Sequence, residues 1–515
     1  MSRILGATSL AGGVHRRVDV AIVGSGAGGA TLAARLASQG LEVALLEAGG
    51  AHTSADWGAS DERVSYPMLY QDRGSRTTDD AAITVLQGRS LGGGTTVNWT
   101  TCFRTPDRVL ARWAERHGAT SWTSEALRPH FEAVEARLNI TPWEEGLANP
   151  NNASLRDGAR RLGIEATGLR RNVKGCRNSG SCGLGCPHDA KMAMHLTMIP
   201  DAVTSGATVY TDVAVDRVVM EGRRATGIRG RVLHRGSERT TGAEVAIDAD
   251  VVAVCGGAIN SPALLLRSGL GADLPEIGRR TFLHPVVAVT AEFEAPVHAW
   301  YGAPQSIASH ASIDRGPNRV GYFLEAAPLH PMLAAIALGM GGPEQAAAMS
   351  RLRHTTTTIG LSMDGWVEGD EGGTVTVDGA GRARLAYPVG PLLAEAMHAA
   401  MRDLVSIQLA AGALRVGTLH VDPVVVTDVQ GLGALDAAAY GAHEHGIFSA
   451  HQMGGCRIGT GPGDGVVDDS LRVFGVENLF VVDGSVFPTS LGVNPSETIY
   501  AMAHRAAAGI AAEAG

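Results

Sequence analysis

Residues 18–50, VDVAIVGSGAGGATLAARLASQGLEVALLEAGG, decide the fold. The first six, VDVAIV, are rich in β-branched residues and have about the length of one strand. The glycine-rich turn Gly24–Gly29 follows at once, then a helix-forming stretch, Ala30–Ser38, and a second apolar run, Leu41–Leu46. A strand, glycine turn, helix and strand in this order predict a Rossmann-like βαβ unit that binds a dinucleotide.

The glycines are spaced Gly-x-Gly-x-x-Gly, and Glu47 lies 18 residues after the last of them. Gly24 permits the tight turn, Gly26 lets the backbone approach a pyrophosphate, and Gly29 lets helix and strand pack closely. The pyrophosphate would lie on the helix N-terminus, and Glu47 would accept hydrogen bonds from the ribose hydroxyls. A glycine turn without a ligand is the alternative. The motif does not separate FAD from NAD, although the glycines after Glu47 favour FAD.

Composition restricts the partners. The chain has 43 Lys and Arg against 52 Asp and Glu, which gives a net charge of −9, and it has no block of basic residues. It is therefore a poor candidate for binding nucleic acid. The longest later apolar stretch, Met332–Met340, is too short to span a bilayer. The first 24 residues lack the order of a secretory signal. We therefore expect a cytoplasmic protein with no membrane span.

Later segments add a second glycine cluster and further strands. Gly92–Gly94 in QGRSLGGGTTVNWT, residues 87–100, could wrap a phosphate or flavin ring with backbone N–H groups; a surface turn is the alternative. Residues 206–232 alternate as short strands and predict a β-meander. Asp250–Cys255 predicts a further strand, which leads into Gly256-Gly257 and a helix.

Five segments in this order resemble the glucose–methanol–choline (GMC) oxidoreductases. They are GSGAGG (24–29) with Glu47, GRSLGGGTTVNW (88–99), GGAINSPALLLRSGLG (256–271), HQMGGCRIG (451–459) and FVVDGSVFPTSLGVNPSETI (480–499). Among subfamilies, NWTTCFRTP (98–106), CGLGCPHDAK (182–191) and SAHQMGGCRIG (449–459) look most like the long-chain alcohol oxidases, and the C-terminal motifs also look like cholesterol oxidase.

The resemblance implies an α/β fold with a Rossmann-like FAD-binding domain built from discontinuous segments, residues 1–105, 190–290 and 450–515. An α+β substrate-binding domain with an antiparallel sheet, residues 106–189 and 291–449, would be inserted between them. The cofactor residues that the resemblance implies are Gly24, Gly26, Ala27, Gly29, Glu47, Ala48, Arg89, Gly92, Gly93, Thr95, Asn98, Trp99, Val213, Gly256, Asp483, Gly484, Asn494 and Pro495.

His451 and Asn494 match the family's catalytic pair and lie 43 residues apart. Alcohol oxidation removes a hydroxyl proton and a hydride from the substrate. Histidine suits the base because its pKa is near neutrality, while N5 of the flavin takes the hydride. Asn494 can donate to the developing alkoxide. Pro495 suits a helix start, and that helix N-terminus would stabilise the reduced flavin.

Other histidines bear on the cofactor and the pocket. Some relatives attach FAD through a His in the glycine-rich loop, but Thr95–Trp99 contains none, so we expect noncovalent FAD. His443 and His445 could line the pocket or act as a second base, and packing or surface roles are the alternative.

Cys176, Cys182 and Cys186 are spaced in a way that suggests a metal or iron–sulfur site, with His188 as a possible fourth ligand. Three thiols do not make the full signature. The resemblance explains the segment as a structural loop beside the flavin domain, and a disulfide within that loop is a further alternative. We expect no metal.

The substrate pocket should be roomy and apolar. Residues 326–341 could form an apolar lid or a core helix, and 392–413 predicts a helix that covers a domain. A hydrophobic alcohol is the expected substrate and oxygen the expected electron acceptor. A dehydrogenase that uses a quinone or another acceptor, and a flavin-containing lyase of the same fold, remain alternatives.

Overall fold

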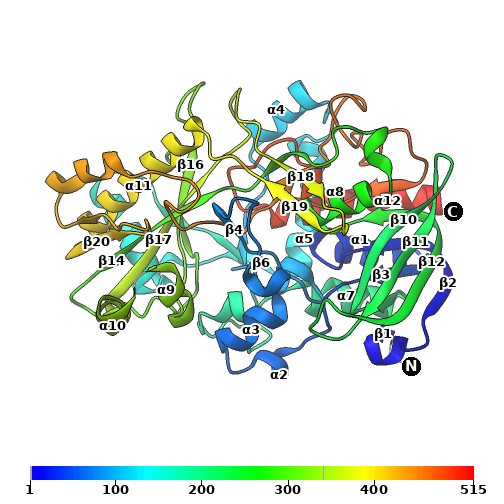
Figure 1. The fold of residues 1–515 in the computed structure, drawn as a ribbon, viewed down its shortest axis with the longest axis horizontal. Helices are drawn as coiled ribbons and strands as arrows, with labels where there is room; N and C mark the ends of the chain where they lie inside the picture. The colour runs from blue at the N-terminus through cyan, green and yellow to red at the C-terminus, as the bar shows by residue number, and fades with distance from the viewer. Residues whose placement is uncertain (1–2, 340) are drawn as a thin grey trace.

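The computed structural model describes residues 3–339 and 341–515. Within these residues the strands form two large and two small sheets. The two large sheets lie at opposite ends of the molecule, as Figure 1 shows. Each has its own buried apolar core, so the chain is organised around two centres.

The mainly parallel sheet is built around the strand that the first motif predicts. Its order is β1-β9-β3-β2-β12-β11-β10, and β24 also pairs with β12. The strand β2 is parallel to both β3 and β12, which confirms the Rossmann-like unit. The strands are β1 (Ile4–Leu5), β2 (Val14–Val23), β3 (Val43–Leu46), β9 (Thr208–Tyr210), β10 (Val213–Glu221), β11 (Arg224–Leu233), β12 (Thr240–Val254) and β24 (Leu479–Val481).

Helices bury their apolar faces against this sheet and against one another. The first of them, α1 (Ala27–Ala37), packs against α12 (Ser496–Ala514) and α7 (Met198–Thr204), while α5 (Ser124–Leu138) packs on α12. The first and last parts of the chain therefore lie side by side, at the right of Figure 1.

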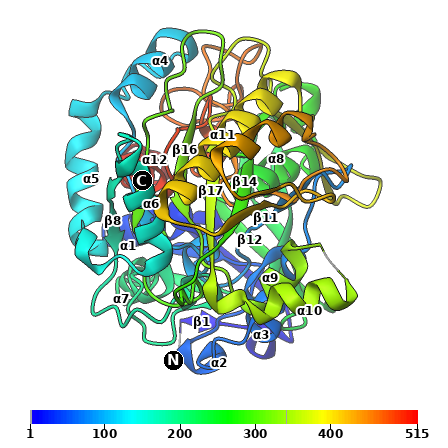
Figure 2. The ribbon, with the colours of Figure 1, turned by 90° about the vertical axis from the view of Figure 1, so that its left-hand side faces the viewer.

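The second large sheet is mainly antiparallel, as expected for the inserted domain. Its order is β21-β20-β14-β17-β16-β15-β7, with β22 beside β14 and β4 beside β22. One face is covered by α11 (Pro391–Ala411), which packs on α6 (Pro150–Arg161), as Figure 2 shows. The strands are β4 (Ile83–Val85), β7 (Thr167–Gly168), β14 (Val286–Glu292), β15 (Ile307–Ser309), β16 (Tyr322–Ala326), β17 (Thr355–Ser362), β20 (Arg415–Thr418), β21 (Val425–Val426) and β22 (Ile447–Ser449).

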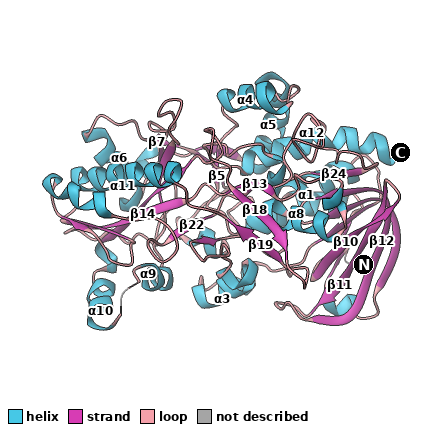
Figure 3. Cartoon of the chain, turned by 45° about the horizontal axis from the view of Figure 1, so that its top comes forward, coloured by secondary structure: helices cyan, strands magenta, loops and turns pink. Residues whose placement is uncertain are grey.

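The two small sheets lie between the large ones (Figure 3). One contains β13 (Arg279–Phe282), β18 (Gly373–Val377), β19 (Ala383–Ala386) and β23 (Met453–Gly454), and the other β5 (Thr101–Cys102), β6 (Ile140–Pro142) and β8 (Arg170–Asn172). The remaining α-helices are α2 (Ser54–Trp57), α3 (Glu62–Leu69), α4 (Asp107–His117), α8 (Gly257–Arg267), α9 (Pro331–Ala337) and α10 (Gly342–Ser350).

Two segments of the chain differ from what the sequence predicts. The strand β4 lies within 1–105 but pairs with β22 of the mainly antiparallel sheet. The stretch 326–341, apart from residue 340, which lies outside the described residues, contains α9, in which only Ala334 is buried. It is therefore a surface helix rather than a core helix. None of the described helices is long and apolar enough to cross a membrane.

Candidate active site

A cavity of about 950 Å³ is lined by residues of both large sheets. The turn after β2 and the ends of β3 and β12 form one side, and β14, β17 and the segment after β22 form another. Most of the residues named from the sequence lie on its wall: Gly24, Gly26, Ala27, Glu47, Ala48, Arg89, Gly93, Thr95, Asn98, Trp99, Val213, Gly256, His451, Asp483, Gly484, Asn494 and Pro495. Gly29 and Gly92, which were also expected to contact the cofactor, are not among the lining residues.

The glycines of the first motif differ in what surrounds them. Gly24 has φ +101°, and a Cβ there would lie 2.3 Å from the carbonyl oxygen of Cys255. A Cβ on Gly29 would lie 1.9 Å from the carbonyl oxygen of Gly24, so helix and strand are in close contact. A Cβ on Gly26 would meet no atom within 4 Å, because this residue faces the cavity. Gly26 therefore leaves room for a ligand rather than for the protein.

Two acidic residues on the cavity wall, Glu47 and Asp483, accept hydrogen bonds from the segments around them. Glu47 accepts hydrogen bonds from the backbone N–H of Ser25 at 3.0 Å, from the Ser25 hydroxyl at 2.7 Å and from the N–H of Gly49 at 2.8 Å. Burial raises the pKa of Glu47 although these bonds oppose the shift. The second, Asp483, accepts from the N–H of Gly257 at 2.8 Å and from the Ser261 hydroxyl at 2.6 Å. Asp483 thereby ties the C-terminal motif to the start of α8.

Three helices begin at the cavity, and their N-cap residues line it. These are Gly26 for α1, Gly256 for α8 and Pro495 for α12, and none accepts a capping hydrogen bond through a side chain. The free N–H groups and the dipole of a helix N-terminus stabilise anions. The start of α1 and the volume of the cavity fit a dinucleotide with an anionic pyrophosphate, whereas the first N–H of α8, that of Gly257, already donates to Asp483.

Two short strand pairings bring the proposed catalytic residues into this cavity. The strand β22 runs parallel to β4, which joins the segment before His451 to the segment before the second glycine cluster. Phe282 of β13 pairs with Met453 of β23, which sets His284 beside His451. The loop before α12 supplies Asn494, whose amide nitrogen lies 3.3 Å from Nε2 of His451.

A second histidine, His284, lies beside His451 and was not expected from the sequence. It is fully buried, has φ +44°, and its Nδ1 lies 3.2 Å from Nδ1 of His451. The N–H of Gly492 donates to Nε2 of His284 at 3.1 Å, so neutral His284 carries its proton on Nδ1. In the sequence it is only a histidine two residues after a short strand, Arg279–Phe282, that begins with two arginines, and the pairing of this strand with β23 turns it inward.

The two neighbours of His451 favour opposite tautomers. His284 donates to Nδ1 of His451 when His451 carries its proton on Nε2, whereas Asn494 donates to Nε2 when the proton is on Nδ1. Burial lowers the pKa of His451 to about 4, and burial followed by repulsion from His451 and His310 lowers that of His284. The pair is therefore neutral near pH 7.

The wall beside His451 is apolar with one polar corner. Its apolar members are Trp99, Val286, Ile359, Leu361 and Phe448. At the corner Gln305 donates to Glu325 at 2.5 Å and accepts from Thr101 at 3.0 Å. Burial raises the pKa of Glu325 to about 8, which keeps this carboxyl mostly protonated near neutral pH.

Several candidate residues lie elsewhere. His445 is buried against His420 and Tyr440 rather than in the cavity wall, and His443 is exposed. The structure describes all six cysteines, and each is a free thiol, so the Cys176–Cys186 loop contains no disulfide. Among the described residues no cluster of three or more His, Cys, Asp or Glu side chains could hold a metal ion. The helix α9 contributes no residue to the cavity wall.

Comparison with known proteins gives matches along most of the chain. Residues 66–286 and 370–503 match two family models described as GMC oxidoreductase, and residues 22–76 match an NAD(P)-binding Rossmann-like domain. An uncharacterized GMC-type oxidoreductase of Mycobacterium tuberculosis is 31% identical over 95% of this chain and 75% of its own length.

A long-chain-alcohol oxidase of Arabidopsis thaliana is 30% identical over 95% of this chain and 66% of its own length. Among solved structures, pyridoxine 4-oxidase from Mesorbium loti has a TM-score of 0.70 and 20% identity, covering 95% of this chain and 98% of that one. This structural likeness concerns the fold alone.

Proposed function

This chain belongs to the GMC oxidoreductase family, FAD-dependent enzymes that act on CH–OH groups, and we propose that it oxidises a hydrophobic alcohol to an aldehyde or ketone. The observation that carries the proposal is the contact between His451 and Asn494, 3.3 Å apart, in a cavity that Trp99, Val286, Ile359, Leu361 and Phe448 also line. An alcohol oxygen held by these two groups would keep its carbon chain against Val286, Leu361 and Phe448. The similarity to a long-chain-alcohol oxidase supports the same substrate class.

His451 accepts the hydroxyl proton at Nε2 in this proposal. Its neighbours favour opposite tautomers, so the tautomer with a free Nε2 is available when the hydroxyl arrives. Forming that tautomer removes the acceptor of the Gly492 N–H, a penalty of about 1–3 kcal/mol that the hydrogen bond from the substrate offsets. Asn494 donates to the developing alkoxide and holds its oxygen in place.

The proposed cofactor is FAD, bound without a covalent bond. When bound, FAD supplies the hydride acceptor at N5 of its ring. Gly26, the second glycine cluster and the N-terminus of α1 would hold its pyrophosphate, while Glu47 and Val213 would hold its adenosine end. Gly256 would pack beside the dinucleotide, because the first N–H of α8 already donates to Asp483. The segment 92–99 has no histidine for a covalent link. We therefore expect acid precipitation to release the yellow colour from the protein.

The test is anaerobic mixing of the purified holoenzyme with fatty, aromatic, terpenoid, steroid and sugar alcohols. We expect hydrophobic alcohols to bleach the flavin absorbance, and admission of air to restore it with production of peroxide. Bleaching by sugars alone would contradict the proposed substrate class. A flavin that is bleached yet not restored by air would identify a dehydrogenase with another acceptor, and no bleaching by any alcohol would favour the lyase.

A further inference from the structure

The N-terminus of α12 carries a buried acid that the reaction does not use. Asn494, Pro495 and Ser496 line the cavity, and Glu497 follows in the first helical turn. The Glu497 side chain is fully buried. Carboxylates at a helix N-terminus normally act as anions that neutralise the dipole. Here such an anion would compete with the negative charge that a bound flavin acquires on reduction.

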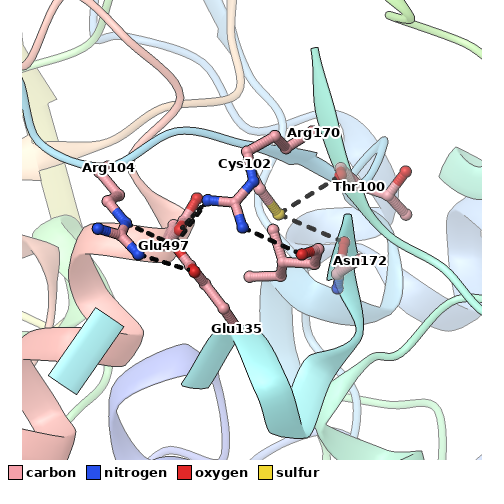
Figure 4. A network of polar contacts seen from close by, with 8 residues as sticks. Thr100, Cys102, Arg104, Glu135, Arg170, Asn172 and Glu497 are labelled. Atoms are coloured by element: carbon pink, nitrogen blue, oxygen red, sulfur yellow. Dashed lines mark hydrogen bonds and ion pairs between the residues drawn. The ribbon is translucent and has the colours of Figure 1, made fainter. Parts of the chain in front are cut away.

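The surroundings of Glu497 favour its neutral form. In the described part of the chain neither of its oxygens accepts a hydrogen bond, and its closest cation, Nη1 of Arg170, is 3.7 Å away. Glu135 of α5 holds the cations instead. It accepts from Arg104 at 2.6 and 2.9 Å and from Arg170 at 2.6 Å (Figure 4).

The carboxyls of Glu497 and Glu135 are neighbours, because an oxygen of each lies near Nη1 of Arg170, at 3.7 and 2.6 Å. Two carboxylates can only accept hydrogen bonds, whereas a protonated Glu497 can donate one to Glu135. Burial, the hydrogen bond with Glu135 and repulsion from it raise the pKa of Glu497 to about 8. Burial raises the pKa of Glu135, but the bonds from Arg104, Arg170 and Glu497 outweigh it and lower that pKa well below its usual range.

Every charged or titratable group that faces Glu497 fits this assignment. Arg104 and Arg170 face it from the loop after β5 and from β8, and both are engaged by Glu135 of α5. The Cys102 thiol of β5 and the Tyr500 hydroxyl of α12 also lie near it. Burial raises the pKa of both groups, so neither is charged near neutral pH. Among the described residues, Arg170 is the cation that reaches Glu497, at 3.7 Å, and its shorter contact of 2.6 Å goes to Glu135.

We propose that Glu497 is a positioning residue of the flavin site, whose buried carboxyl keeps its proton by donating to Glu135 and so leaves the N-terminus of α12 positive toward the flavin. This rests on the proposed binding of FAD with its ring at that helix end. Ionisation of Glu497 would cancel part of the dipole where reduction adds negative charge, and the flavin would become harder to reduce.

The experiment measures the flavin midpoint potential of the holoenzyme between pH 6.5 and 9.5 by chemical reduction, without any alcohol. Above pH 8 the midpoint potential of the wild type should be lower than that of Glu497→Gln. The expected difference is at least a tenfold change in the reduction equilibrium, which is about 30 mV for two electrons. Below pH 7 the two should agree. The control Glu513→Gln, on the far end of α12, should follow the wild type throughout.

A second variant tests the same proposal independently of whether Glu497→Gln folds. In Glu135→Gln the released arginines should pair with Glu497 and stabilise its ionised form. The flavin midpoint potential of this variant at pH 7 should therefore fall to the value that the wild type reaches only above pH 8. Identical potentials at every pH in wild type, Glu497→Gln and Glu135→Gln would overturn the proposal. Because chemical reduction needs no substrate, a failure to oxidise alcohols would leave this result interpretable.

Discussion

At the scale of single residues, the site depends on two histidines, His284 and His451, whose Nδ1 atoms lie 3.2 Å apart. Full burial keeps both rings neutral, since a charged imidazole would be expensive to desolvate. A neutral His451 can accept a proton over the whole physiological range. Its low pKa makes it a weaker base than a solvated histidine, and the adjacent amide of Asn494 compensates by stabilising the alkoxide.

This assignment predicts how flavin reduction depends on pH. The rate with a saturating alcohol should be constant near neutral pH and should fall as the pH drops through about 4, the pKa of His451, because a protonated imidazole cannot accept the hydroxyl proton. Double-mixing stopped-flow spectroscopy, with a brief exposure to acid, measures the rate. A midpoint near 6.5, the ordinary pKa of histidine, would contradict the buried, neutral state.

Brief exposure matters because the same burial affects stability. The unfolded chain binds protons on its histidines below about 6.5, while His284, His310 and His451 stay neutral in the folded state. Their contribution to the free energy of unfolding is therefore present above pH 6.5 and is lost as the pH falls toward 4. Reduction by dithionite, which needs no base, serves as the control for a folded holoenzyme.

At the scale of elements, two glycines of the turn between β2 and α1 have different roles: Gly29 permits packing within the protein, and Gly26 leaves room for the ligand. Gly29→Ala should lower the thermal unfolding temperature and abolish FAD retention, because its Cβ would overlap the Gly24 carbonyl at 1.9 Å. Gly26→Ala should keep the unfolding temperature of the apoprotein and weaken only FAD binding, because nothing in the protein lies within 4 Å of its Cβ. Differential scanning fluorimetry and flavin titration measure the two effects. Equal loss of stability in both variants would contradict this division.

The sequence was sufficient for elements whose signal is local. The run 18–23 lies within β2, the glycine turn opens α1, and the apolar spacing of 392–413 predicted α11, because each pattern reflects the face that a single element buries. The order of motifs also indicated the family, and the fold class is confirmed. For the site, His451 and Asn494 could be named because they lie within motifs, and the structure brings their side chains together.

Long-range pairing could not be read in the same way. His284 becomes a neighbour of His451 through the pairing of Phe282 with Met453, two short strands without any periodicity of their own. Glu325 and Glu497 look like ordinary surface acids in the sequence, and only the tertiary structure buries them. The apolar composition of 326–341 suggested a lid or a core helix, but α9 lies at the surface, where its neighbours bury only Ala334 fully and leave Ile336 exposed.

At the scale of the whole molecule, the cavity lies between the cores of the two large sheets. Its walls come from both large sheets, and the short pairings of β4 with β22 and of β13 with β23 hold them together. A ligand that fills this cavity contacts both halves, so its binding free energy stabilises both. FAD at 100 times its dissociation constant should add about 2.7 kcal/mol to the free energy of unfolding.

We therefore expect the holoenzyme to unfold in one transition, above the transitions of the apoprotein. Scanning calorimetry with and without excess FAD measures this. If FAD shifted only part of the unfolding and left a second transition at its apoprotein temperature, the cavity would not couple the two sheets as the structure indicates.

The central claim is that His451 takes the proton of an alcohol beside a bound flavin. The most direct measurement is anaerobic stopped-flow reduction of His451→Ala, with the exposed His443→Ala as the matched control. We predict that His451→Ala retains FAD but is reduced by alcohol at least about a hundredfold more slowly, as expected for the loss of a general base, while His443→Ala behaves as the wild type. Reduction of His451→Ala at nearly the wild-type rate would contradict the account.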